Sequence, residues 1–206
     1  MSPAHGARGE RRKARPAGSG AACLPRRTLL AAALGVCAGV RAQPGSASGP
    51  PPELSQVLPE ARVQGSCRLR VIGLHVYDAR LWVGEQPVGD EWMDRPFALE
   101  LEYARSLKGS LIAERSLQEM QRQDAITPEA AQRWLNAMRQ LFPDVGAGDR
   151  ITGVHLPGRG ARFYVNGGLR GESRESDFVR LFFGIWLSPR TSEPALRDAL
   201  LGRARS

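Results

Sequence analysis

Residues 68–83 carry the most informative alternation of apolar and polar positions in the chain. Arg68 and Arg70 share one parity and apolar residues take the other, which is typical of a strand with one buried face. The parity changes near Gly73 and changes again a few residues later. The pattern therefore predicts one long strand that is broken by a bulge or bend at Gly73. Its polar side chains either line a pocket or face solvent.

The rest of the pattern predicts a mixed set of strands and helices. Alternation over 97–103 predicts a half-buried strand, and helical spacing of apolar residues predicts helices over 111–123 and 128–142, the second with Thr127 as its N-cap. Five further elements follow: strands over 151–156 and 161–165 and near Leu169, a helix over 176–186, and a last helix that ends at Gly202. This order predicts an α+β fold with a largely antiparallel sheet that helices cover on one face.

The first 42 residues have the pattern of an export signal. A basic head is followed by an unbroken apolar run over 29–40, which is too short for the roughly 20 residues that span a bilayer. Small residues around Ala42 indicate cleavage after that position. The pair Arg26 and Arg27 before the run resembles a twin-arginine signal, and a general secretion signal is the alternative. The mature protein is then expected in the periplasm.

Residues 43–56 are rich in Gly, Ser and Pro, which predicts a flexible linker, so that one folded domain occupies 57–206. The formal net charge of the whole chain is +8. Residues 1–42 hold eight of the 29 Lys and Arg residues and one of the 21 acidic residues, which leaves a net charge of about +1 after cleavage. The mature domain therefore has no basic surface that would indicate nucleic acid, and no membrane partner is expected once the signal is removed.

Other chemistry is sparsely represented. Cys67 is the one cysteine after residue 42, so no intramolecular disulfide is predicted and its thiol is interpreted as a small apolar group. His75 and His155 stand on predicted strands without partners at metal-ligand spacing. Phosphate-loop, dinucleotide and Gly-x-Ser-x-Gly fingerprints do not occur. The sequence thus predicts neither a metal site nor a cofactor.

Three stretches together resemble the chalcone isomerase-like superfamily, in its exported bacterial branch. They are residues 65–83 with VYDARLW at 76–82, the turn PGRG at 157–160, and FFGIWLSPRTSEPALRDALLG at 182–202. The resemblance covers about 57–203 and implies an open-faced β-sandwich, in which a large antiparallel sheet and its helices enclose a cleft. Plant enzymes of this superfamily close a chalcone into a flavanone, whereas related non-catalytic members bind fatty acids in the same cleft.

The resemblance also implies which positions would carry catalysis. The family arginine that holds a phenolate falls at Arg68 or Arg70 on the central strand. The plant threonine falls at Arg70 when Ile72-Gly73 is matched, and the plant tyrosine and asparagine fall near Ile112 and Glu119. Because these side chains differ from the plant set, no catalytic residue is predicted, although the arginine is retained.

A binder of a fatty acid or another small apolar carboxylate needs less. One arginine at the closed end of an apolar cleft, helped by a tyrosine, is enough. Arg68 or Arg70 with Tyr77 or Tyr103 would supply that site. Each arginine has the equally weighted alternative of a solvated strand face or an ion pair with a strand carboxylate such as Glu100.

The sequence therefore leads to one preferred function and two alternatives. The preferred function is non-catalytic binding of a fatty acid or a similar carboxylate. The first alternative is an isomerase, an intramolecular lyase that acts on an unknown conjugated substrate. The second is a structural periplasmic domain whose cleft is filled by its own side chains.

Overall fold

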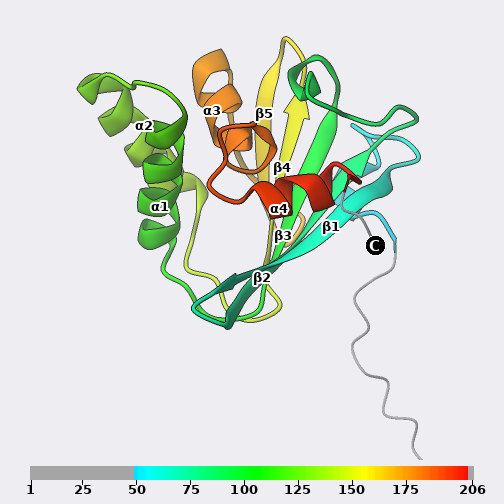
Figure 1. The fold of residues 1–206 in the computed structure, drawn as a ribbon, viewed down its shortest axis with the longest axis horizontal. Helices are drawn as coiled ribbons and strands as arrows, with labels where there is room; N and C mark the ends of the chain where they lie inside the picture. Colours follow the sequence, from blue (N-terminus) through cyan, green and yellow to red (C-terminus); the bar gives the residue numbers. More distant parts are fainter. Residues whose placement is uncertain (1–48, 204–206) are drawn as a thin grey trace, which may run out of the picture. The chain divides into compact units, whose positions relative to one another are not determined.

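The computed structural model describes residues 49–203 (Figure 1). The predicted signal peptide over 1–42 and the start of the predicted linker lie outside the described residues. Within 49–203, none of the helices has the length and apolar character needed to cross a membrane.

Six consecutive strands form a single antiparallel sheet in the order of the chain. The strands are β1 (Arg62–Val71), β2 (Leu74–Val83), β3 (Phe97–Tyr103), β4 (Arg150–Leu156), β5 (Gly160–Val165) and β6 (Gly168–Ser173). Four α-helices accompany them in the described residues: α1 (Gly109–Gln123), α2 (Pro128–Leu141), α3 (Ser176–Leu187) and α4 (Pro194–Leu200). Two 3-10 turns, η1 (Pro52–Leu54) and η2 (Trp92–Asp94), lie in the connecting segments. The predicted α+β class is confirmed.

The predicted long strand over 68–83 is wrong in one respect, because the chain reverses where a bulge was expected. Val71 pairs with Leu74, so Ile72 and Gly73 form a two-residue hairpin turn between β1 and β2. Both turn residues have positive φ, 50° and 74°, as the tight turn between twisted strands requires. Asn-Gly is the usual sequence for such a turn, and a β-branched residue with positive φ is an outlier. Because isoleucine is unusual at this turn position, the sequence did not indicate a turn. The change of parity near Gly73 marks the point where the chain reverses direction.

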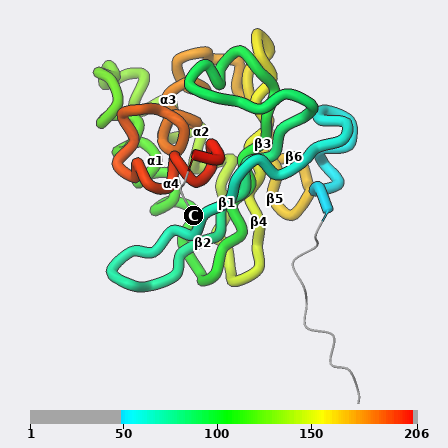
Figure 2. The backbone as a smooth tube through the Cα atoms, turned by 45° about the vertical axis from the view of Figure 1, so that its right-hand side comes forward, coloured from blue at the N-terminus to red at the C-terminus, as the bar shows by residue number. Residues whose placement is uncertain are grey.

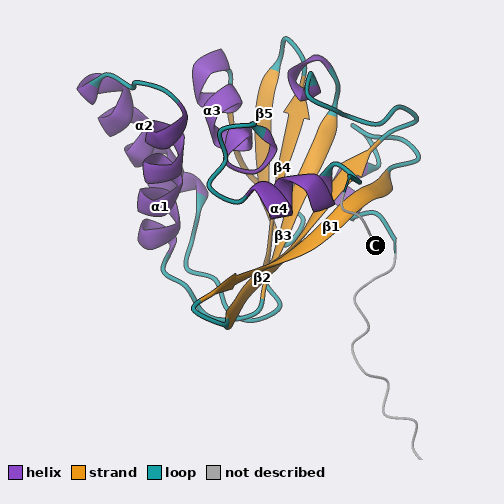
Figure 3. Ribbon diagram, in the orientation of Figure 1, coloured by secondary structure: helices purple, strands orange, loops and turns teal. Residues whose placement is uncertain are grey.

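The helices gather on one side of the sheet (Figures 2 and 3). Helix α3 packs on β5 and also contacts α1 and α4, and α4 lies along β1. The core side of α3 is almost entirely apolar. Its buried side chains are Phe178, Val179, Leu181, Phe182, Phe183, Trp186 and Leu187. Helix α1 has its main contacts with α2 and α3. As predicted, the Thr127 side chain caps α2 by accepting a hydrogen bond from the Ala130 amide.

The opposite face of the sheet is partly covered by the segment before β1. Leu54 and Leu58 pack against Trp82 and neighbouring apolar side chains of β3 and β4. The Glu53 carboxylate accepts a hydrogen bond of 2.9 Å from Thr152 on β4. Glu53 and Leu54, which belong to the predicted flexible linker, therefore contact the sheet. The Pro- and Ser-rich composition of the linker concealed Leu54, which packs together with Leu58 four residues later.

A close approach between β1 and α4 tests this architecture. A Cβ added to Gly65 would lie 2.1 Å from the Ala199 carbonyl oxygen, a backbone atom that cannot rotate away. We expect Gly65→Ala to lower the free energy of unfolding by about 3 kcal/mol, the upper range for overpacking in a core. Urea unfolding followed by tryptophan fluorescence measures the loss. Gly84→Ala is the matched control, since its nearest neighbour is a Leu58 methyl group at 3.9 Å. Equal stability of the two variants would contradict the close packing of α4 on β1.

Candidate cleft between the sheet and the helices

A mostly apolar cleft of about 550 Å³ lies on the side of the sheet that the helices cover. The β1–β2 hairpin and the end of β3 form one wall, and α1, α3 and the start of α4 form the other. Apolar side chains of α3 and α4, such as Phe182, Ile185 and Leu196, belong to the lining. The volume falls within the range of about 300–1,000 Å³ that small-molecule sites occupy.

Two tyrosines place neutral hydroxyl groups in this cleft. Tyr77 on β2 and Tyr103 at the end of β3 are cross-strand partners whose rings meet edge to face, 5.9 Å apart. Trp186 on α3 donates a hydrogen bond of 2.9 Å from Nε1 to the Tyr77 hydroxyl oxygen. Burial raises the pKa of both phenols well above the usual value of a tyrosine. Each phenol therefore keeps its proton at neutral pH and can donate it in a hydrogen bond.

Four charged side chains line the cleft: Arg105, Arg115, Glu119 and Glu193. Arg115 on α1 pairs with the buried Glu119 one turn later at 2.5 Å, and Arg122 approaches the same carboxylate at 3.5 Å. Arg105 follows β3, is exposed and lines the cleft. No carboxylate of residues 49–203 forms a salt bridge with Arg105. Arg105 is thus the lining cation whose charge is available to a ligand.

The structure brings two of the four predicted site residues together. Tyr77 and Tyr103 line the cleft, whereas Arg68 and Arg70 are not part of its lining. Arg68 Nε instead lies 2.7 Å from Asp78 Oδ1 across the hairpin, with half of its side chain exposed. Leu69, between the two arginines, takes the cleft side of β1. The alternation that the sequence shows is therefore present, but the arginines occupy the other face.

The strand carboxylates considered as partners of those arginines have a different partner. Arg80 on β2 forms salt bridges with both Glu100 and Glu102 of β3. Trp82 Nε1 donates a further hydrogen bond of 3.0 Å to Glu100. Glu100 is almost completely buried, and such a charge needs partners of this kind. The cluster stabilises the sheet on the face opposite the cleft.

The two helix positions that the resemblance assigns to the plant tyrosine and asparagine do face the cleft. Ile112 and Glu119 both belong to its lining. The first supplies an apolar side chain and the second a carboxylate that is held by arginines. Neither side chain can donate a hydrogen bond to a developing enolate, as that reaction requires.

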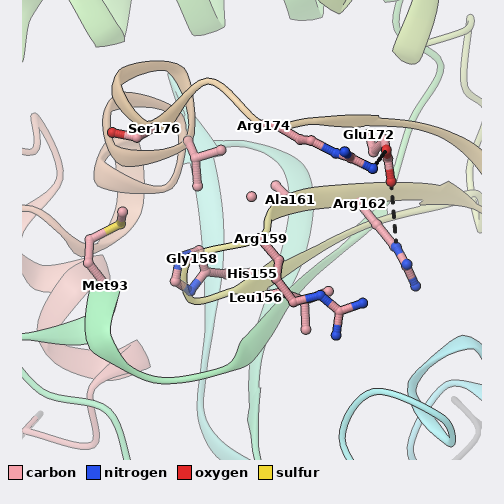
Figure 4. Close-up of a pocket in the computed structure, with 12 residues that line it drawn as sticks. Met93, His155, Leu156, Gly158, Arg159, Ala161, Arg162, Glu172, Arg174 and Ser176 are labelled. Carbon is pink, nitrogen blue, oxygen red and sulfur yellow. Dashed lines mark hydrogen bonds and ion pairs between the residues drawn. The ribbon is translucent and has the colours of Figure 1, made fainter.

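A second hollow of about 390 Å³ lies near the β4–β5 turn and the start of α3 (Figure 4). Arg162 and Arg174 on its border both pair with Glu172. His155 is buried there, with Nδ1 3.1 Å from the Arg95 carbonyl oxygen, and burial lowers its pKa. Two of its three arginines are thus already engaged, Arg159 being the third, and its border is more polar than the apolar cleft.

The remaining candidate groups supply no reactive site. Among residues 49–203 no group of three or more His, Cys, Asp or Glu side chains is arranged to hold a metal ion. Cys67 is a free thiol on β1, and burial, together with nearby Asp78, raises its pKa to about 12. The thiolate is the reactive form, so this cysteine is inert at neutral pH.

Sequence reasoning missed the lining residues Arg105, Arg115 and Trp186. Arg105 has the same parity as Tyr103 two residues earlier, but it lies beyond the end of β3, where alternation does not fix the side of a residue. The hydrogen bond between Trp186 and Tyr77 joins residues 109 positions apart, so no local sequence pattern indicates it.

Three comparisons bear on this architecture. The family described as chalcone isomerase-like matches residues 65–202. An uncharacterized protein of Haemophilus influenzae is 29% identical over 113 residues, which are 55% of this chain and 55% of that protein. The chain therefore spans about half the length of this curated relative. A crystal structure of a fatty-acid binding protein of Arabidopsis thaliana has a TM-score of 0.55, with 13% identity, over 69% of this chain and 87% of that chain. At this identity the likeness shows the fold.

The raised pKa values of the cleft tyrosines predict an alkaline loss of stability. A group whose pKa is higher in the folded state contributes stability below its unfolded pKa, about 10 for tyrosine, and loses it as the pH rises through the folded value. We expect the free energy of unfolding to fall above about pH 10. The fall should be smaller in the Tyr77→Phe/Tyr103→Phe double variant, because phenylalanine cannot ionise. Urea unfolding at a series of alkaline pH values measures the slopes, and identical slopes would contradict the burial of these phenols.

Proposed function

The chain belongs to the chalcone isomerase-like family, and from this membership and its cleft we propose that it binds a fatty acid or another small apolar carboxylate. The observation that carries the proposal is the cleft itself. Its lining is mostly apolar, and the side chains of residues 49–203 leave it open. An apolar cavity with a few convergent polar groups is the usual form of a site for an amphiphilic ligand. The fold shared with the Arabidopsis fatty-acid binding protein supports the proposal.

The polar end of the ligand is assigned to the mouth of the cleft. Arg105 supplies a cation there, and Tyr103, two residues earlier, supplies a neutral hydroxyl donor. Hydrogen bonds in which the donor or the acceptor is ionised, as a carboxylate acceptor is, are about twice as strong as those between neutral groups. The hydrocarbon part then contacts the apolar side chains of α3 and α4, including Ile185 and Leu196. In this arrangement the arginine is at the open end, whereas the sequence led us to expect it at the closed end.

The two alternatives are less well supported by the site. A structural domain would fill the cleft with its own side chains, and the described residues do not do so. An isomerase would need hydrogen-bond donors at the helix positions that carry Ile112 and Glu119. We therefore propose binding without chemical conversion. Export through a signal peptide over 1–42 remains part of the proposal.

The proposal is tested with dodecanoate as the probe. We expect the purified protein to bind it in isothermal titration calorimetry and to release it unchanged on solvent extraction. Arg105→Ala should weaken binding by about tenfold, because a hydrogen bond to a charged group contributes about 1.5–3 kcal/mol and exposure of Arg105 places it at the lower end. Tyr103→Phe should weaken it less, because it removes a neutral donor.

Arg68→Ala is the matched control. It also removes one arginine from the same end of the sheet, but Arg68 pairs with Asp78 outside the cleft, so the affinity should stay unchanged. Wild-type protein that does not bind dodecanoate would overturn the proposal. Loss of binding in Arg68→Ala but not in Arg105→Ala would overturn the assignment of the anchor. Recovery of a chemically altered probe would favour the isomerase.

A further inference from the structure

We propose that the mouth of the cleft docks on the surface of an anionic lipid bilayer, from which the cleft takes its ligand. The inference rests on the proposed function and extends it to the source of the ligand. The docking surface consists of the β1–β2 hairpin tip and the first turn of α1, and its apolar members are Val71, Ile72, Leu74 and Leu111.

Exposed large apolar side chains are concentrated on this docking surface. Six such residues occur in 49–203, and four of them are Val71, Ile72, Leu74 and Leu111. Ile72 at the hairpin tip is 97% exposed, and the other three are at least half exposed. All four also line the cleft, and the hairpin projects beyond the neighbouring strands (Figure 2). Single exposed apolar residues need no explanation, but a contiguous group at the rim of a cleft marks an interaction site.

The conformation of Ile72 gives a second, independent observation. Its φ of 50° is a value that β-branched residues rarely adopt and that Asn or Gly adopts readily. The residue therefore carries backbone strain, and its side chain gains no burial within the described protein in return. Strain of this kind is found at functional sites, where the side chain has a purpose that a relaxed residue would not serve. Insertion of the isoleucine into the acyl boundary of a bilayer supplies that purpose.

The charges around the docking surface select an anionic bilayer. Arg70 is the neighbour of Val71 on β1, and Arg105 lies beside β2, since the Ala104 amide donates a hydrogen bond to the Val76 carbonyl oxygen. Neither arginine has a carboxylate partner among residues 49–203. The other basic groups nearby are already neutralised: Arg68 by Asp78, Lys108 by Asp144, and Arg115 by Glu119. Two uncompensated cations thus flank an apolar tip, and each contributes about 1 kcal/mol to binding at an anionic lipid surface.

The same side chains form the rim of the cleft and the apolar part of the docking surface. A fatty acid or a similar lipid therefore passes from the bilayer into the cleft along apolar side chains, without exposing its chain to water. This inference revises the expectation that the mature domain has no membrane partner. It concerns the surface of the bilayer and agrees with the finding that no described helix could span it.

Flotation of the full chain with vesicles tests the docking surface. The vesicles are phosphatidylcholine alone or phosphatidylcholine with about one third phosphatidylglycerol, a content that gives the negative surface potential on which docking depends. We expect binding to the anionic vesicles, with the partition coefficient lowered about tenfold in Ile72→Asn. Asparagine relieves the positive φ, so this variant should be at least as stable as wild type to urea. Leu169→Asn is the matched control, since Leu169 is also exposed but lies on β6, and it should bind like wild type.

Hydrogen exchange separates this surface from any contribution of residues 1–48. On addition of anionic vesicles, amides over 70–76 and 109–113 should exchange more slowly, while those over 166–171 should not change. Equal partition of Ile72→Asn and Leu169→Asn, or no protection of 70–76, would overturn the inference.

Arg70→Gln tests the charge separately from ligand binding. We expect it to lower the partition on anionic vesicles about fivefold and to leave the affinity for dodecanoate unchanged, because Arg70 does not line the cleft. Equal binding of wild type to neutral and anionic vesicles would overturn the electrostatic part. A protein that binds dodecanoate but not vesicles disproves docking and leaves the proposed function intact. A protein that binds vesicles through residues 70–76 but not dodecanoate disproves the proposed function instead.

Discussion

The packing of α3 between the sheet and α1 is the constraint on which the cleft depends. On one side Phe183 meets Phe97 of β3 edge to face at 4.9 Å, within a group of aromatic rings that fixes α3 on the sheet. On the other side the Gln123 amide of α1 donates a hydrogen bond of 2.9 Å to the Leu181 carbonyl oxygen of α3. Helix α1 therefore rests mainly on α3 and α2 and not on a strand. The space between α1 and the β1–β3 half of the sheet is left open as the cleft.

The distribution of charge follows from the same arrangement. Ionised groups are costly in the interior unless they are paired, and the buried phenols that line the cleft are neutral. The buried carboxylate of Glu100 lies with Arg80 on the opposite face of the sheet. Arg105, the cation available to a ligand, is at the mouth. The cleft is thus polarised along its length, and an amphiphile has one favourable orientation in it, with its charged end outermost.

Much of the fold follows from local patterns in the sequence. The bounds of the strand over 97–103 and the start of the helix after Thr127 agree with β3 and α2, because alternation, a capping hydroxyl and Pro128 are local signals. The strand was expected to be half-buried, but both of its faces are covered, and Glu100 on the polar side is buried. The hairpin was missed because Ile72 occupies a turn position where the tertiary structure overrides its preference for extended backbone. A local pattern can show that a strand has two unlike faces, but it cannot show which of them the helices cover.

That limit explains the different outcomes for the candidate site residues. Tyr77 and Tyr103 are apolar enough to belong to the covered face, and the structure places both in the cleft. For Arg68 and Arg70 the question was which face of β1 the helices cover, the face of the two arginines or the face of Leu69. The contacts of α3 and α4 determine this, and they cover the face of Leu69. Arg105 follows the end of β3, where alternation no longer applies by rule. A site assembled from a strand end and a turn is therefore the part of this protein that its sequence conceals best.

The polarity of the cleft and that of its docking surface support one another. In a bilayer the carboxylate of a fatty acid lies at the headgroup level and its chain in the acyl region. A domain docked by Ile72 would hold Arg105 near the headgroups, because both lie at the cleft mouth. The carboxylate can then stay at the interface beside a cation while the chain moves from acyl neighbours to the apolar lining. If the arginine were at the closed end, the carboxylate would have to enter the cleft first, and its burial would carry a desolvation cost. An arginine at the mouth is therefore better suited to loading from a membrane than one at the closed end.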